Sequence, residues 1–220
     1  GASDAGADCL VLCDTNGGSL PFQIEETVSE VVSQLGTPIG VHLHNDTGCG
    51  VANAMAGVMA GATQVQGTIN GYGERVGNCD LVPIIANLSL KLGVKTLPDE
   101  CMEKLTSVAH HVAELVNFSS DPQQPYVGSG AFAHKAGLHV SAISRRPDAY
   151  EHIDPNLVGN GTRFLVSEMS GKSTIELRAQ QLGLDIGGET LNEVVETLKD
   201  LEYLSFLVAD EAISSFFVLI

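Results

Sequence analysis

Residues 38–69 read "PIGVHLHNDTGCGVANAMAGVMAGATQVQGTI", and this segment decides the fold. It opens with a short apolar run, 38–43, and closes with another, 63–69, each of the length of a buried strand. Between them, 48–61 is rich in Ala and Gly, which predicts a helix that can lie close to a sheet. A strand, a helix and a strand in this order predict two parallel strands joined by a right-handed crossover.

The same alternation continues on both sides of this segment. We predict another strand at 8–13, where "DCLVLC" is bounded by polar and glycine residues, and helices at 21–36 and 79–93. Three β/α units fit either a Rossmann-like sheet or a (β/α)8 TIM barrel, and both folds carry their chemistry at the carboxyl ends of the strands. The polar residues expected at those ends are Asp14–Asn16, His42–Asp46 and Asn70–Arg75.

The chain changes character after a helix expected at 99–116. Residues 117–139 are rich in Pro, Gly and Ser and then in His, which indicates a linker into a second unit. We therefore expect part of a catalytic barrel at 1–118 and a small linker or lid subdomain of α+β and helical structure at 119–220. The elements expected in that subdomain are an extended, turn-rich stretch at 150–166 and helices at 172–183 and 189–203.

The composition excludes several functional classes. The 220 residues carry 11 Lys and Arg against 27 Asp and Glu, a formal net charge of −16, with no basic tract. This charge argues against binding to nucleic acid or to an anionic membrane surface. The five cysteines form no CxxC pair, which favours a reducing, cytoplasmic setting. The apolar tail, 202–220, is interrupted by Asp210 and Glu211, so we predict no membrane span.

His42 and His44 are the most informative pair of polar residues. Residues i and i+2 of a strand point to the same face, so both imidazoles are expected in one space. Two converging imidazoles suit a divalent metal ion, but a pair of hydrogen-bonded core histidines has the same spacing. Asp46 and Thr47, which follow, are expected to cap the next helix.

The loop "NGYGERVGNCD" (70–80) nearly matches the dinucleotide fingerprint GxGxxG but misses its spacing by one residue. We interpret it as a glycine-loosened loop that places Glu74, Arg75 and Asn78 over the mouth of the barrel. An ion pair between Glu74 and Arg75 within the loop is the alternative for Arg75. Asn78 could supply a neutral oxygen ligand to a metal held by the histidines, whereas Cys79 suits plain packing.

Two further groups of residues have both a functional and a structural interpretation. Thr15, in "DTNGG", could hold a carboxylate through its hydroxyl and nearby N–H groups, or it could serve in helix capping. His134, His139 and Tyr150 could be acid/base groups on a lid, or exposed structural residues.

Five blocks in this order, "LCDTNGG", "HLHND", "QVQGTINGYGERVGN", "AFAHKAGLH" and "YEHIDPNLVGN", resemble the family of 2-isopropylmalate, homocitrate and citramalate synthases. The sequences of these blocks are most similar to the (R)-citramalate synthase branch. The resemblance implies a fragment that holds the last three β/α units of a (β/α)8 barrel and the linker subdomain but lacks the N-terminal half. The opening "GASDAGADCL", which begins as if inside a helix-to-strand connection, agrees with that expectation.

The resemblance also implies a reaction. This is a Claisen condensation in which acetyl-CoA loses a methyl proton, its enolate attacks the ketone of a 2-oxo acid, and the thioester is hydrolysed. The acid implied is pyruvate, giving (R)-citramalate for isoleucine biosynthesis. A divalent metal (Mg²⁺, Mn²⁺ or Zn²⁺) and acetyl-CoA as co-substrate are implied, as is a homodimer of the full-length protein.

The residues that match the motifs of the family take roles from it. His42 and His44 are then metal ligands, Asn78 lies beside the ion, and Thr15 holds the carboxylate of the oxo acid. Glu74 matches a glutamate of the site, and His134, His139 and Tyr150 match lid groups that take part in proton transfer. The Arg-Asp pair of the family's first strand, whose Asp is a metal ligand, has no counterpart in this chain.

Other functions remain open at this point. The chain could belong to a 2-isopropylmalate or homocitrate synthase, to a hydroxymethylglutaryl-CoA lyase or related aldolase, or to a non-catalytic protein that uses the histidine pair structurally. The blocks "AFAHKAGLH" and "YEHIDP" favour the synthases over the lyases.

Overall fold

The computed structural model describes residues 1–134, 146–164, 172–184, 186 and 188–204. The chain divides into two compact units, Gly1–Gly128 and Ser129–Ile220, so the division lies after the boundary expected at 118. Each unit is described by itself. No helix of the described residues has both the length and the apolar character needed to cross a membrane.

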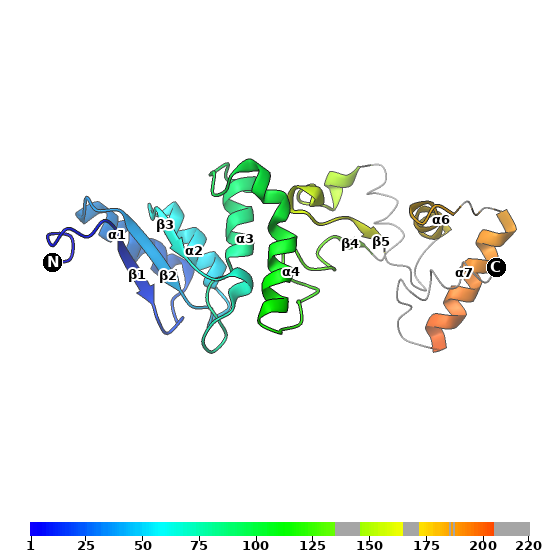
Figure 1. Ribbon diagram of the computed structural model, residues 1–220, viewed down its shortest axis with the longest axis horizontal. Helices are drawn as coiled ribbons and strands as arrows, with labels where there is room; N and C mark the ends of the chain where they lie inside the picture. The colour runs from blue at the N-terminus through cyan, green and yellow to red at the C-terminus, as the bar shows by residue number, and fades with distance from the viewer. Residues whose placement is uncertain (135–145, 165–171, 185, 187, 205–220) are drawn as a thin grey trace. The chain divides into compact units, whose positions relative to one another are not determined.

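The first unit is built on three parallel strands in the order β1-β2-β3 (Figure 1). These strands are β1 (Leu10–Asp14), β2 (Ile39–Leu43) and β3 (Gln64–Gln66). The helices α1 (Pro21–Gln34) and α2 (Gly50–Met59) make the two crossovers. Each crossover moves the chain on by one strand in the same direction, as consecutive units of a (β/α)8 barrel do. The expected α/β fold class is therefore confirmed.

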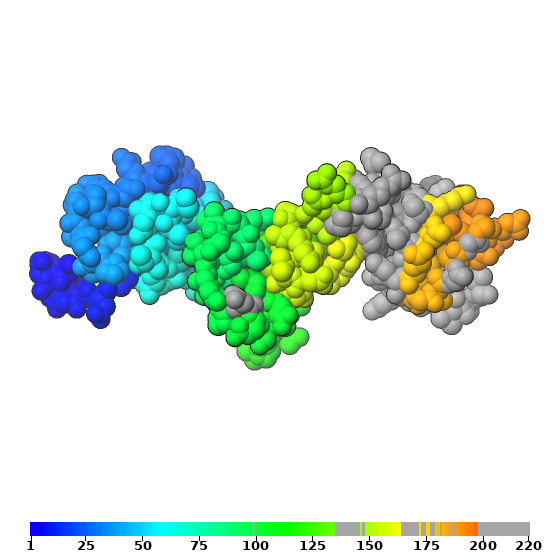
Figure 2. Space-filling view, turned by 90° about the horizontal axis from the view of Figure 1, so that it is seen from above, coloured from blue at the N-terminus to red at the C-terminus, as the bar shows by residue number. Residues whose placement is uncertain are grey.

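The core of this unit lies between β2 and the two crossover helices. Val41 of β2 is buried against Val28 of α1 and Ala54 of α2. The small residues of α2 allow the close approach that the sequence predicts, because a Cβ added at Gly57 would lie 3.1 Å from Cγ1 of Val41. Figure 2 shows the side chains of the first unit, coloured from blue to green, as one continuous packed surface.

The alternation of β2 separates the core from the site. Its side chains at 39, 41 and 43 belong to the core, so those at 40 and 42 point to the opposite face of the sheet. This second face carries no helix of the crossovers. In a barrel it is the interior face, and it is where functional side chains reach the carboxyl ends of the strands.

Strand β3 is shorter than the expected 63–69, because the chain leaves the sheet after Gln66. Thr68 pairs with Asp80 instead of continuing along β2. Gly67 permits this change of partner, since a Cβ there would lie 2.5 Å from the carbonyl oxygen of Cys79.

The remaining helices of the first unit are less regular than expected. The helix predicted at 79–93 is α3 (Leu81–Ala86), followed by a π-helical turn at Asn87–Lys91. Asp80 caps α3, and its Oδ1 accepts the N–H of Val82 at 2.9 Å. The helix predicted at 99–116 begins as a 3-10 turn, Asp99–Lys104, and continues as α4 (Leu105–Leu115).

Among its described residues, the second unit has one pair of short strands. Its strands β4 (Ala133–His134) and β5 (Arg163–Phe164) pair in parallel, with short 3-10 turns at Pro147–Ala149 and Pro155–Val158 between them. The helices expected at 172–183 and 189–203 are confirmed as α6 (Lys172–Gln181) and α7 (Gly188–Leu204). Most of the apolar tail, 202–220, lies outside the described residues.

Candidate functional site

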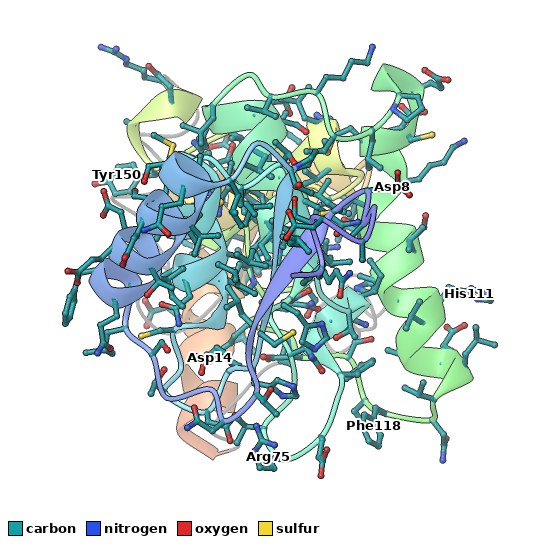
Figure 3. All side chains as sticks on the ribbon, turned by 90° about the vertical axis from the view of Figure 1, so that its left-hand side faces the viewer. Asp8, Asp14, Arg75, His111, Phe118 and Tyr150 are labelled. Atoms are coloured by element: carbon teal, nitrogen blue, oxygen red, sulfur yellow. The ribbon has the colours of Figure 1, made fainter. Side chains whose placement is uncertain are left out.

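Loops from all three strands of the first unit meet at one end of the sheet. Figure 3 shows Asp14 and Arg75 at this end of β1, with Asp8 toward the other end. The connection after β2 pairs with the loop after β3, because His44 forms an antiparallel bridge with Asn78. The backbone N–H of Asn45 also donates to the carbonyl of Gly77 at 3.0 Å. The polar segments that the sequence places at strand ends therefore lie together.

The two histidines share one space, as their spacing predicts. The ring centroids of His42 and His44 lie 5.5 Å apart, with the planes at 58°. His42 is half-buried, and His44 is 9% exposed. The Nδ1 atom of His44 is buried and has no hydrogen-bond partner among the described residues. A structural core histidine normally has a partner for each buried nitrogen, because an unmet polar atom costs about 1–3 kcal/mol.

Asn78 completes this group from the loop after β3. Its Nδ2 lies 3.2 Å from Nε2 of His42, and the residue is 8% exposed. A side chain at position 73 would collide with it, since a Cβ added at Gly73 would lie 2.0 Å from Oδ1 of Asn78. The structure thus brings together the three residues for which the sequence predicts metal binding.

The donor set of this group fits a divalent cation. It offers two imidazoles, one of which has a nitrogen without a hydrogen-bond partner, and one amide. The described residues contain no group of three or more His, Cys, Asp or Glu side chains able to hold a metal, so the third ligand from this chain would be the amide of Asn78. The Cys79 thiol has no hydrogen bond to either histidine, and burial raises its pKa to about 11. Its Sγ instead donates to the carbonyl of Gln66 at 3.2 Å, in line with the packing role expected for it.

Arg75 ties the three strand-end loops together. Its Nε and Nη2 donate to Oδ1 and Oδ2 of Asp46 at 2.7 and 2.8 Å, and Nη2 also donates to the carbonyl of Thr15 at 2.9 Å. Hydrogen bonding to this guanidinium lowers the pKa of the Asp46 carboxyl below its ordinary value. The partner of Arg75 is therefore a residue from the neighbouring loop, and the ion pair with Glu74 that was the alternative is wrong.

The cap expected from Asp46 and Thr47 is also wrong. The helix α2 begins only at Gly50, whose N–H donates to Oδ1 of Asn45 at 2.8 Å. Asp46 is engaged by Arg75, and the Thr47 hydroxyl faces the carbonyl of Ser19 at 3.5 Å.

Thr15 lies beside this ion pair on an open hollow of about 750 Å³, lined by Cys13, Asp14, Thr15, Asn16, Asp46 and Arg75. The threonine side chain is exposed, as is that of Glu74 in the loop after β3. The lining is polar, with the Thr15 hydroxyl beside the guanidinium of Arg75 and the carboxylates of Asp14 and Asp46. The roles expected for Thr15 and Glu74 stay predictions.

The lid residues belong to the second unit. Nε2 of His134 lies 3.4 Å from Oε1 of Glu151, which is 8% exposed and also accepts the Thr162 hydroxyl at 2.6 Å. Tyr150 is exposed (Figure 3), and His139 lies outside the described residues. The acid/base roles expected for these residues likewise stay predictions.

Two glutamines near the site, Gln66 and Gln124, were not predicted from the sequence. Gln66 lies opposite His42 on β3, a neighbour that only the register of the two strands reveals. Gln124 donates through Nε2 to Oδ1 of Asn70 and to Oδ2 of Asp80, both at 3.0 Å, beside a cavity of about 250 Å³. Burial raises the pKa of the Asp80 carboxyl. No local pattern signals this second contact, since Gln124 is 44 residues from Asp80.

Family models match both parts of the chain. The HMGL-like model matches residues 1–112, which include every strand of the first unit and the loops at their ends. The chain belongs to the HMGL-like family. A second model, described as homocitrate synthase post-HMGL domain-like, matches residues 126–204.

Relatives of this HMGL-like chain include several synthases. The (R)-citramalate synthase of Streptomyces coelicolor is 54% identical over 207 residues, covering 93% of this chain and 39% of that protein. The (R)-citramalate synthase of Geobacter sulfurreducens is 48% identical over 204 residues, covering 91% and 38%. The homocitrate synthase of Pyrococcus horikoshii is 39% identical over 184 residues, covering 84% and 50%. The chain therefore spans about 39% of the length of the citramalate synthases that it matches.

Proposed function

We propose that this chain forms part of the active site of an acyltransferase that condenses acetyl-CoA with pyruvate to give (R)-citramalate. The observation that carries the proposal is the group of His42, His44 and Asn78, with its partnerless buried nitrogen, at the carboxyl ends of parallel strands. The resemblance of the chain to proteins named (R)-citramalate synthase, at up to 54% identity, supports the choice of reaction.

In this proposal His42, His44 and Asn78 hold a divalent cation beside the oxo acid. Such a cation polarises the ketone and stabilises the negative charge that develops on its oxygen. The Thr15 hydroxyl donates to the carboxylate of the oxo acid, and the Arg75–Asp46 ion pair keeps the Thr15 loop in place through the Thr15 carbonyl.

Proton transfers fall to the remaining predicted residues. A base removes one methyl proton of acetyl-CoA, the methyl carbon bonds to the ketone carbon, and the new alkoxide is protonated. Water then cleaves the thioester, releasing CoA and the second carboxylate. We assign these proton transfers to Glu74, His134, His139 and Tyr150 as a group. A cytoplasmic setting, a homodimer and a place in isoleucine biosynthesis are further parts of the proposal.

A graft tests the proposal. The chain replaces the 207 matching residues of the Streptomyces coelicolor relative, and release of free CoA thiol is followed with acetyl-CoA and pyruvate in the presence of Mn²⁺. We expect activity in the graft and its loss in His44→Ala. Thr15→Ala should lower kcat/KM, because the carboxylate loses a donor, whereas Ser33→Ala on α1 should leave it unchanged. A folded graft without CoA release would contradict the proposal.

Homocitrate or 2-isopropylmalate synthesis is the second candidate. It is supported by the homocitrate synthase of Pyrococcus horikoshii and by the second family model, whose description names homocitrate synthase. Oxo acids that differ by a methylene or two are separated by only about 1–3 kcal/mol per group. The same graft is therefore assayed with 2-oxoglutarate and 2-oxoisovalerate. A larger kcat/KM for either acid than for pyruvate would replace the first candidate.

A further inference from the structure

The two ring nitrogens of His42 have different partners. Nδ1 lies 3.2 Å from Oε1 of Gln66, and Nε2 lies 3.2 Å from Nδ2 of Asn78. A neutral imidazole has one N–H and one lone pair, and an amide oxygen can only accept. The proton of His42 therefore belongs on Nδ1, and the lone pair on Nε2 faces Asn78. This is the tautomer that can ligate a cation through Nε2.

The orientation of the Gln66 amide is itself fixed by a neighbour on the same strand. Nε2 of Gln66 donates to Oε1 of Gln64 at 3.5 Å, which leaves Oε1 of Gln66 as the atom that faces His42. The Cys9 thiol also donates to Oε1 of Gln64, at 3.6 Å. Oε1 of Gln64 thus accepts from both Gln66 and Cys9, and the hydrogen bonds of these residues connect with that of His42.

The sheet register brings Gln66 to this position. Gln66 is the direct cross-strand partner of His42 between β3 and β2, so the two side chains stand side by side on the face away from the helices. The hydrogen bond needs no rearrangement of the loops, because both residues belong to regular strands.

We propose that Gln66 is a positioning residue, which holds His42 as the Nδ1–H tautomer with Nε2 directed at the cation site. The inference rests on the proposed function for the role of the cation. The hydrogen bond between Gln66 and His42 does not depend on that proposal. Outer partners of metal-bound histidines fix the tautomer and ring orientation, and their loss typically lowers metal affinity or activity about 10- to 100-fold.

The test compares three variants of the same graft. Gln66→Leu removes the acceptor, Gln66→Glu keeps an acceptor oxygen, and Gln34→Leu removes an exposed glutamine that hydrogen-bonds to Glu30 on α1. The Kd for Mn²⁺ alone is measured by electron paramagnetic resonance. The tautomer is read from ¹⁵N-histidine correlation spectra, with the His42 signals identified by their absence in His42→Gln.

We expect Gln66→Leu to weaken Mn²⁺ binding by about 10- to 100-fold and to lose the Nδ1–H signature of His42. Gln66→Glu should retain both properties, and Gln34→Leu should match the parent. An unchanged Kd together with a retained Nδ1–H in Gln66→Leu would overturn the inference even if the graft makes citramalate. Conversely, a graft with no condensation activity would refute the proposed function, while Mn²⁺ affinity and the tautomer would still decide the role of Gln66.

Discussion

Arg75 is the residue on which the shape of the strand-end loops depends most visibly. It adopts a left-handed backbone conformation, with φ of 59°, and reaches two other loops with one guanidinium. The planar fork donates to both oxygens of Asp46, a geometry that a lysine ammonium cannot reproduce. Charge alone therefore does not explain the choice of residue.

Arg75→Lys should impair catalysis without unfolding the protein. The ammonium can still neutralise Asp46 but cannot also hold the Thr15 carbonyl, so the Thr15 loop loses a tether. Misplacement of a substrate-binding group by about 1 Å can cost up to about 100-fold in rate. We expect a rise in KM for pyruvate in the graft, measured by CoA release, with an unaltered circular dichroism spectrum. Arg146→Lys, whose arginine pairs with Asp148 in the second unit, is the matched control.

The Asp46 carboxyl should titrate below its ordinary range. Because its folded pKa lies below the ordinary value of 3.8, its ion pair contributes stability that is present above the unfolded pKa and is lost as the pH falls through the folded pKa. The carboxyl ¹³C shift of Asp46, followed by NMR in acid, should give a midpoint below 3.8, and Arg75→Met should raise it. An unchanged midpoint in Arg75→Met would show that another group lowers the pKa.

Among the elements, α2 shows how composition sets packing distance. Gly57→Val should destabilise the unit by about 1–3 kcal/mol, the usual cost of overpacking a core, because a Cβ at this position already lies 3.1 Å from Val41. The free energy of unfolding is measured in urea. Gly36→Ala is the control, since a Cβ at Gly36 has no neighbour within 4 Å. Equal stability of the two variants would mean that α2 can move off the sheet.

Periodicity and composition predict the elements because each reflects a local property. The helix expected at 21–36 is Pro21–Gln34, and the strand expected at 38–43 is Ile39–Leu43. The length of β3 was not predictable in this way, because Gly67 turns toward Cys79, a residue from a later element. Whether a segment is a helix or a strand thus follows from its own sequence, whereas the residue at which it ends depends on contacts with later parts of the chain.

The same distinction separates the parts of the site. The shared face of His42 and His44 follows from the i, i+2 spacing within one strand, and the structure has the two rings together. The partners of Arg75 and of Gln124 come from loops 29 and 44 residues away. Glu74 and Arg75 are oppositely charged neighbours, and from the sequence they suggest an ion pair within the loop. In the structure Arg75 has a left-handed backbone conformation and pairs with Asp46.

At the scale of the whole molecule, the described sheet has two free edges. Both β1 and β3 pair only with β2 among the described residues, and the face that carries His42 has no helix of the crossovers over it. Unpaired strand edges are templates for association. We expect the 220-residue chain alone to form oligomers or aggregates and to lack condensation activity.

Size-exclusion chromatography with light scattering measures this association directly. The graft, in which the flanking sequence comes from the Streptomyces coelicolor relative, should elute as a defined species at the same concentration. A monodisperse monomer of the isolated chain that catalyses condensation would contradict the expectation.

The pairing of Gln66 with His42 also has a consequence for how such genes can diverge. The two residues meet through strand register, and a shift of one residue in β3 would turn Gln66 to the core side of the sheet. Changes of length between α2 and β3 are therefore constrained as well, because the N–H of Thr63 donates to the carbonyl of Ile39 at 2.8 Å and Ala62 is buried in the core. Loss of a single codon within 64–66 would place a different residue beside His42. Related proteins should therefore keep the number of residues in β3 more strictly than the identities of the residues around it.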